Sequence, residues 1–434
     1  MATFVTVATI GSAVPRQSGE GLVLADGGNP HPVRLVRPLP APLSAMAQLG
    51  RDVFFDRTLS SSGRLSCASC HSPQRAYGPP NDLPVMAGGA TLARQGVRAV
   101  PSLMYLERQP NFSVGPDDAE REGATTPPSN GSAAAPKSAQ NPARSAQNLV
   151  PQGGLFWDGR VDTLQSQALE PVLNPLEMDG GSVARVAAKL RHAPYAPRLV
   201  QLFGPTVFDQ SRVAVGEALF AVARYQIEDV AFHPYSSKYD RWLEGEARLT
   251  PAEAHGYALF NDPARANCAA CHLDRPADIG LPPLFTDHQY EALGVPRNAT
   301  LTVNRLPGYY DLGVCGPLRT DMKEQRYCGM FLTPTLRNVA MRHAFFHNGV
   351  YHTLQQVLDF YDFRDTKPQR IYPRRRDGTI AKFDDLPARD RGNVDTTDAP
   401  FDRTLGETPP LTAQDERDII AFLQTLTDGY RTRK

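Results

Sequence analysis

Residues 65–73 read LSCASCHSP and place the pattern C-x-x-C-H at Cys67, Cys70 and His71. The pattern recurs in residues 267–274, NCAACHLD, which supply Cys268, Cys271 and His272. Four of the six cysteines therefore belong to two copies of one pentapeptide. A zinc site or a thioredoxin-like redox pair would use the cysteines, but neither explains a histidine directly after the second cysteine in both copies.

C-x-x-C-H is the attachment sequence of a c-type haem. The two thiols bond to the vinyl groups of the macrocycle, and the adjacent imidazole becomes an axial ligand of the iron. The sequence therefore predicts two covalently bound haems c. Their proximal iron ligands are expected to be His71 and His272.

The composition sets limits on partners and location. The chain has 434 residues with 46 acidic and 46 basic side chains, so its charge gives no reason to expect a nucleic-acid partner. It contains no run of 18 apolar residues, and we expect no membrane span. Covalent haem attachment takes place outside the bacterial cytoplasm, which predicts a periplasmic protein. The first 14 residues, however, lack the basic start of a clear signal peptide.

Two cysteines lie outside the haem motifs, at Cys315 and Cys328. In an oxidising compartment a spare pair of this kind predicts a disulfide. A role as reactive thiols is the alternative interpretation.

The order of helical segments suggests a repeated architecture. A helical pattern precedes each haem motif, at residues 44–56 and 252–262, and this order is typical of the entry to a cytochrome c domain. We expect a mainly α fold of two cytochrome c-like domains, each with one covalent haem, joined by long ordered loops. The expected parts are an N-terminal extension (1–42), a first haem domain (43–245) with an irregular insertion (117–148), and a second haem domain (246–434).

The remaining axial position decides what each haem can do. Between His71 and Trp157 there is no histidine, and Met86 and Met104 are the only methionines, so an open first iron that binds peroxide is expected. For the second iron, Tyr361 falls on the apolar face of the helical segment 353–363. On this pattern alone a buried core tyrosine is the better interpretation. The rival ligands are Met322, Met330, Met341, His343, His347 and His352.

Two longer stretches carry a family resemblance. Residues 154–178 read GLFWDGRVDTLQSQALEPVLNPLEM, and residues 333–361 read TPTLRNVAMRHAFFHNGVYHTLQQVLDFY. Together with the two C-x-x-C-H motifs and a closing helix, they resemble the bacterial di-haem cytochrome c peroxidase and MauG family. The resemblance covers most of residues 43–430.

The resemblance implies roles for individual residues. Trp157 corresponds to the tryptophan between the two haems, Gln167 and Pro171 to the distal pocket of the first haem, and Glu177 to the acid/base group that acts on peroxide. Tyr361 stands where the peroxidase branch has a methionine ligand and the MauG-like branch a tyrosine, which favours Tyr361 as ligand of the second iron. Ala99 stands where many members have a calcium-binding asparagine, so calcium is doubtful.

The implied function is peroxide-dependent oxidation. A MauG-like enzyme would use hydrogen peroxide to form a high-valent, bis-Fe(IV)-like state that oxidises aromatic residues, above all tryptophan, on a partner protein. The region around Cys315 and Cys328 resembles relatives from methanobactin operons. The alternative is a periplasmic cytochrome c peroxidase that takes electrons from a small cytochrome or cupredoxin. A non-enzymatic electron-transfer cytochrome is the third interpretation.

Overall fold

The structure is a computed structural model that describes residues 21–117, 149–277 and 279–431. The expected insertion at 117–148 and the first part of the expected N-terminal extension lie almost wholly outside these residues. Helices dominate the regular structure, as expected. In the described ranges no helix is both long and apolar enough to cross a bilayer.

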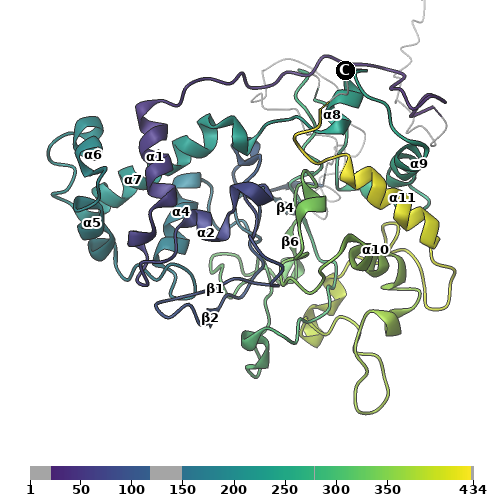
Figure 1. Cartoon of the computed structure of the whole chain (residues 1–434). Coiled ribbons are helices and arrows are strands. Elements are labelled where there is room, and N and C mark those ends of the chain that lie inside the picture. The colour runs from purple at the N-terminus through teal and green to yellow at the C-terminus, as the bar shows by residue number, and fades with distance from the viewer. Residues whose placement is uncertain (1–20, 118–148, 278, 432–434) are drawn as a thin grey trace, which may run out of the picture.

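The helices fall into two groups that lie in opposite halves of the molecule (Figure 1). The first group consists of α1 (Ala45–Phe55), α2 (Cys67–Cys70), α4 (Leu164–Leu173), α5 (Val183–Arg191), α6 (Ala196–Phe203) and α7 (Ser211–Glu228). The second consists of α8 (Lys238–Leu243), α9 (Pro251–Phe260), α10 (Leu354–Phe363) and α11 (Ala413–Gln424). Long segments with short 3₁₀ turns connect them.

Strands are few and short. They form three antiparallel ribbons of two strands each within the described residues. The pairs are β1 (Ala87–Gly88) with β2 (Arg94–Gln95), β3 (Ser113–Pro116) with β4 (Leu149–Gln152), and β5 (Tyr290–Glu291) with β6 (Phe331–Leu332).

Local sequence explains where the main helices begin. The Thr250 side chain accepts a hydrogen bond from the backbone of Glu253, the Glu253 carboxylate bonds back to Thr250, and Pro251 occupies the first helical position of α9. This capping box satisfies backbone N–H groups that the first turn leaves free. The same device starts α10 at Thr353 and Gln356.

One helix crossing is repeated in the two halves. Gly50 of α1 lies against the backbone of Ala221 in α7, and Gly256 of α9 lies against the backbone of Asp418 in α11. A Cβ at either glycine would overlap the facing carbonyl oxygen, so only glycine permits this close approach. Each pair of crossed helices packs beside one C-x-x-C-H motif.

Two hydrophobic cores surround these crossings. The first includes Leu49 and Phe54 of α1 with Leu219 and Val222 of α7. The second includes buried residues of α9 and α11 and also Tyr239, Trp242 and Leu243 of α8. Residues of α8 therefore pack with the second core, although they precede the expected boundary at 245/246. The division of the chain at that point stays a prediction.

Candidate active site

The first haem motif is held as a short helix with a fixed histidine. The side chain of Ser69 accepts a hydrogen bond from the backbone of Ser66 at the start of α2. His71 ends the helix, and its Nδ1 lies 3.1 Å from the carbonyl oxygen of Tyr77. Since a carbonyl can only accept, Nδ1 carries the proton and Nε2 keeps its lone pair for a metal. Burial lowers the pKa of His71 to about 4, so the imidazole is neutral.

The second motif repeats this arrangement. Cys268–Ala270 form a 3₁₀ turn, and Nδ1 of His272 lies 2.9 Å from the carbonyl oxygen of Phe285. Burial lowers the pKa of His272 to about 4 as well. The two residues whose carbonyl oxygens accept these hydrogen bonds, Tyr77 and Phe285, are buried aromatic residues with positive φ, at 50° and 57°. Positive φ is strained for bulky residues, so the surrounding structure must hold both carbonyls in place.

None of the four motif cysteines forms a disulfide within the described residues. Burial raises the pKa of Cys67, Cys70 and Cys268 to about 12, and that of Cys271 well above its ordinary value. The reactive thiol of a redox-active C-x-x-C pair has a lowered pKa, so these directions do not favour the thioredoxin-like interpretation. In the described ranges no group of three or more His, Cys, Asp or Glu side chains is placed to hold a metal ion, which does not favour the zinc interpretation.

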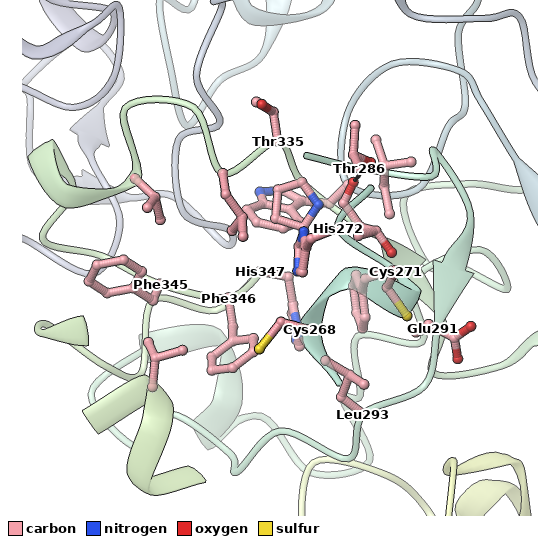
Figure 2. A pocket seen from close by; sticks show the side chains of 18 of the residues that line it. Cys268, Cys271, His272, Thr286, Glu291, Leu293, Thr335, Phe345, Phe346 and His347 are labelled. Atoms are coloured by element: carbon pink, nitrogen blue, oxygen red, sulfur yellow. Dashed lines mark hydrogen bonds between the residues drawn. The ribbon is translucent and has the colours of Figure 1, made fainter. Parts of the chain in front are cut away.

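The second motif faces a large cavity of about 300 Å³. Figure 2 shows Cys268, Cys271 and His272 at its wall. Most of the other lining is apolar, with Leu293, Phe345 and Phe346 among the contributing side chains. Two thiols and a neutral imidazole beside an apolar cavity are the chemistry that a covalent haem requires, so the residues fit this group.

Tyr361 lines the same cavity from α10. Its ring stacks on Phe401 with centroids 5.3 Å apart, and burial raises the pKa of its phenol above the ordinary value. Its hydroxyl makes no hydrogen bond to any residue that the structure describes. The residue is only partly buried, so its hydroxyl is open to whatever occupies the cavity, and its role as an iron ligand stays a prediction.

The rival ligands separate by position. Of the six, His347 is the one that lines the large cavity within the described residues; Met322, Met330, Met341, His343 and His352 do not. The His347 ring lies flat on Phe331, with centroids 3.6 Å apart and an interplanar angle of 5°. Its Nε2 is buried, lies 3.7 Å from an Asp385 carboxylate oxygen and has no hydrogen-bond partner among the described residues, so His347 stays a rival of Tyr361.

The first motif faces a smaller cavity of about 50 Å³. It brings Gln167, Pro171 and Glu177 together with Cys67, Cys70 and His71. Their assignment to the distal side of the first haem stays a prediction. Met86 also lines it, whereas Met104 lines the large cavity. Gln167 and Leu103 line both, so the two cavities adjoin.

Glu177 lines the small cavity, although the residue as a whole is solvent-exposed. Burial raises the pKa of its carboxyl above that of an ordinary glutamate, while a hydrogen bond from Asn174 Nδ2 to Oε1 at 2.7 Å opposes the shift. A carboxyl group whose pKa is raised gains and loses its proton at a pH closer to neutrality. Asn174 also fixes the orientation of the group.

Trp157 is fixed on the wall of the large cavity. Its indole Nε1 donates to the carbonyl oxygen of Ala99 at 2.8 Å, and its own carbonyl accepts from Leu332 at 3.0 Å. The indole is thus held between a loop of the first half and β6.

Cys315 and Cys328 form a disulfide, with Cα atoms 5.0 Å apart, as predicted. The bridge lies beside Tyr290, Val314 and Tyr327, in a small core of its own.

Comparison with known proteins places the chain in a family. Residues 44–248 match the model described as di-haem cytochrome c peroxidase. The methylamine utilization protein MauG of Paracoccus denitrificans (strain Pd 1222) is 33% identical over 399 residues, covering 88% of this chain and 89% of the relative. The chain belongs to the di-haem cytochrome c peroxidase/MauG family. It is a peroxide-dependent di-haem oxidoreductase, and it adopts that family's fold.

Solved structures and a second relative agree with this membership. The diheme peroxidase BthA of Burkholderia thailandensis E264 has a TM-score of 0.75 and 34% identity, covering 94% of this chain and 92% of BthA. A MauG-like protein associated with microbial copper homeostasis has a TM-score of 0.56 and 25% identity, covering 92% and 95%. Cytochrome c551 peroxidase of Nitrosomonas europaea is 28% identical over 331 residues, covering 76% of each chain.

The pocket of this di-haem peroxidase contains one polar residue that sequence reasoning missed. Gln226 of α7 lines the small cavity and is buried, and its Oε1 has no hydrogen-bond partner among the described residues. A glutamine within the buried face of the helical segment 211–227 was the available signal. Its free oxygen gives the first haem site an acceptor in addition to Glu177.

Proposed function

We propose that this di-haem peroxidase uses hydrogen peroxide to oxidise aromatic residues, above all tryptophan, on a partner protein in the periplasm. The observation that carries the proposal is Tyr361, which lines the second haem cavity with an unbonded phenol. Names among the relatives support both branches of the family, since MauG proteins and cytochrome c peroxidases both occur.

The protein first holds two haems in different surroundings. Cys67, Cys70 and His71 would hold one, and Cys268, Cys271, His272 and Tyr361 the other. When bound, the haems supply the redox chemistry: the first is the site of peroxide cleavage and the second stores an oxidising equivalent. The side chains around them determine which proton moves and where charge is stable.

Glu177 transfers a proton between the two oxygens of peroxide. Because burial raises the pKa of this carboxyl, it takes a proton from one peroxide oxygen and returns it to the other within the same pocket. The second oxygen then leaves as water. Gln167 lines the same cavity and positions peroxide through its amide.

Tyr361 determines the character of the second site. Because burial raises the pKa of the Tyr361 phenol, the group would stay protonated without a metal; a bound iron would displace the proton, which would leave to water. The resulting phenolate is a hard, anionic donor that stabilises oxidised iron, whereas a thioether would favour reduced iron. Trp157 is held by hydrogen bonds between the two halves and lines the large cavity, as Gln167 does. It provides a route for an electron between them.

The experiment compares two electron donors for the peroxide-oxidised enzyme, a tryptophan derivative and a reduced cytochrome c. Peroxide is added to the all-ferric holoenzyme without a reductant, and N-acetyl-tryptophanamide or reduced cytochrome c is then supplied. The proposal expects reaction without prior reduction, a stored oxidising state, and an oxidised tryptophan product by mass spectrometry. A requirement for prior reduction, with discharge by cytochrome c alone, would instead support the cytochrome c peroxidase function.

A further inference from the structure

The guanidinium of Arg342 has no anionic partner among the residues that the structure describes. It follows the 3₁₀ turn Val339–Met341 and lines the large cavity. Its Nη2 donates to the carbonyl oxygens of Val100 at 2.9 Å and Ala344 at 3.3 Å. Within the part of the chain that the structure describes, Nε and Nη1 have no hydrogen-bond partner and no carboxylate pairs with the group.

Other enclosed arginines of this chain are paired. Arg98 bonds to Asp311 at 2.7 Å, and Arg337 bonds to Asp240 at 2.8 Å. Their pKa values are raised, because the carboxylates compensate for burial. Burial lowers the pKa of Arg342 to about 10, with no compensating charge. An enclosed guanidinium without an anion is costly, so a group bound beside Arg342 must supply the anion. The large cavity reaches both motifs, because Arg75, Ala76 and Gly78, which follow the first one, also line it.

The position of Arg342 relates it to the first haem. A Cβ at Gly78 would lie 3.8 Å from Nη1, so the guanidinium approaches the backbone directly after Tyr77, the residue that orients His71. A side chain from the second half of the sequence thus reaches the proximal side of the first site.

We propose that Arg342 binds a propionate carboxylate of the haem attached at Cys67 and Cys70. The free N–H groups of a guanidinium match a carboxylate in charge and in geometry. The pair neutralises both groups in a mostly apolar cavity, and it ties the residues 339–349 to the haem of the other half. The cation also holds the reduction potential of the first haem above the value that a bare propionate would give. The proposal is independent of the partner that the enzyme oxidises.

The test measures the reduction potential of each haem against pH in three holoenzymes: wild type, Arg342→Gln and Arg342→Lys. Spectroelectrochemistry follows the high-spin and low-spin haems separately and needs neither peroxide nor a partner. In Arg342→Gln we expect a lower potential at the first haem that rises again at acidic pH, as the uncompensated propionate takes up a proton. Lysine keeps the charge and should give a smaller shift.

The matched control is Arg319→Gln. Arg319 is buried, pairs with Asp321 at 2.9 Å and does not line the cavity, so both potentials should stay at wild-type values. A wild-type first-haem potential in Arg342→Gln would overturn the proposal, and so would a shift confined to the second haem. If the glutamine variant fails to fold, resonance Raman spectra decide: the propionate bending band should change between wild type and Arg342→Lys, and an unchanged band would refute the contact.

Discussion

The carbonyl oxygen of Tyr77 accepts a hydrogen bond from Nδ1 of His71 at 3.1 Å, and this contact decides which imidazole nitrogen is free. His272 and Phe285 repeat it at 2.9 Å. Both acceptor residues adopt positive φ, so each half of the chain fixes its histidine by the same strained turn. Two sites that share this contact can then differ in function through the other groups that surround each haem.

Haem content is the most direct prediction. Two C-x-x-C-H motifs beside two adjoining cavities should give two haems per chain in a pyridine haemochrome assay. Electron paramagnetic resonance should show one high-spin and one low-spin ferric iron, because Tyr361 is expected to bind the second iron only. Cys67→Ala/Cys70→Ala should lose one covalent haem and the high-spin signal. Two low-spin signals in wild type would contradict an open first site.

Replacing Glu177 by glutamine should slow the reaction with peroxide. A general acid/base group contributes about 10²–10⁴-fold in rate, and stopped-flow absorbance would measure the loss. Glu170→Gln is the control, since Glu170 pairs with Arg160 and does not line the small cavity. Equal rates for wild type and Glu177→Gln would remove Glu177 from the reaction.

The pH dependence of this reaction follows from the same carboxyl. Glu177 must be ionised to accept a proton, so the rate should fall as pH drops through its pKa. Because burial raises that pKa, the acid limb should lie above about pH 4.3, where an exposed glutamate titrates. Glu177→Gln should lack this limb. A limb at the ordinary glutamate value would indicate a different ionising group.

Tyr361→Met should convert the second site to the thioether type. We expect the haem to stay bound and six-coordinate, with a higher reduction potential, because a thioether favours reduced iron. The all-ferric variant should no longer store an oxidising equivalent after peroxide, as measured by near-infrared and Mössbauer spectroscopy. Tyr351→Phe is the control: it also packs on Phe346 and Phe360 but does not line the cavity. Normal storage in Tyr361→Met would show that another residue is the ligand.

Two glycines should respond in opposite ways to alanine. Gly50→Ala places a Cβ on the backbone of Ala221, and overpacking of this kind costs about 1–3 kcal/mol of unfolding free energy. Gly216→Ala lies within α7, where the nearest atom is Gln165 Nε2 at 3.6 Å. It should stabilise by about 0.5–1 kcal/mol through helix propensity. Denaturant unfolding of both holoenzymes measures the difference, and a neutral Gly50→Ala would disprove the tight crossing.

The sequence alone identified what is encoded locally. Five consecutive residues specify haem attachment, so both motifs could be recognised without a fold. The capping boxes at Thr250 and Thr353 likewise depend on residues three apart and were predictable. The family stretches placed Gln167, Pro171 and Glu177 in one pocket, where the structure has them.

Only the tertiary structure decided which distant residues meet. Periodicity put Tyr361 on the apolar face of a helix but did not say what that face contacts. In the fold, Tyr361 and His347 line the large cavity, and the other rival ligands do not. Gln226, Arg342 and the packing of α8 with the second core were beyond sequence reasoning for the same reason. A cavity is made by segments hundreds of residues apart, and burial, which sets the pKa of Glu177 and leaves Arg342 without an anion, exists only once they are packed.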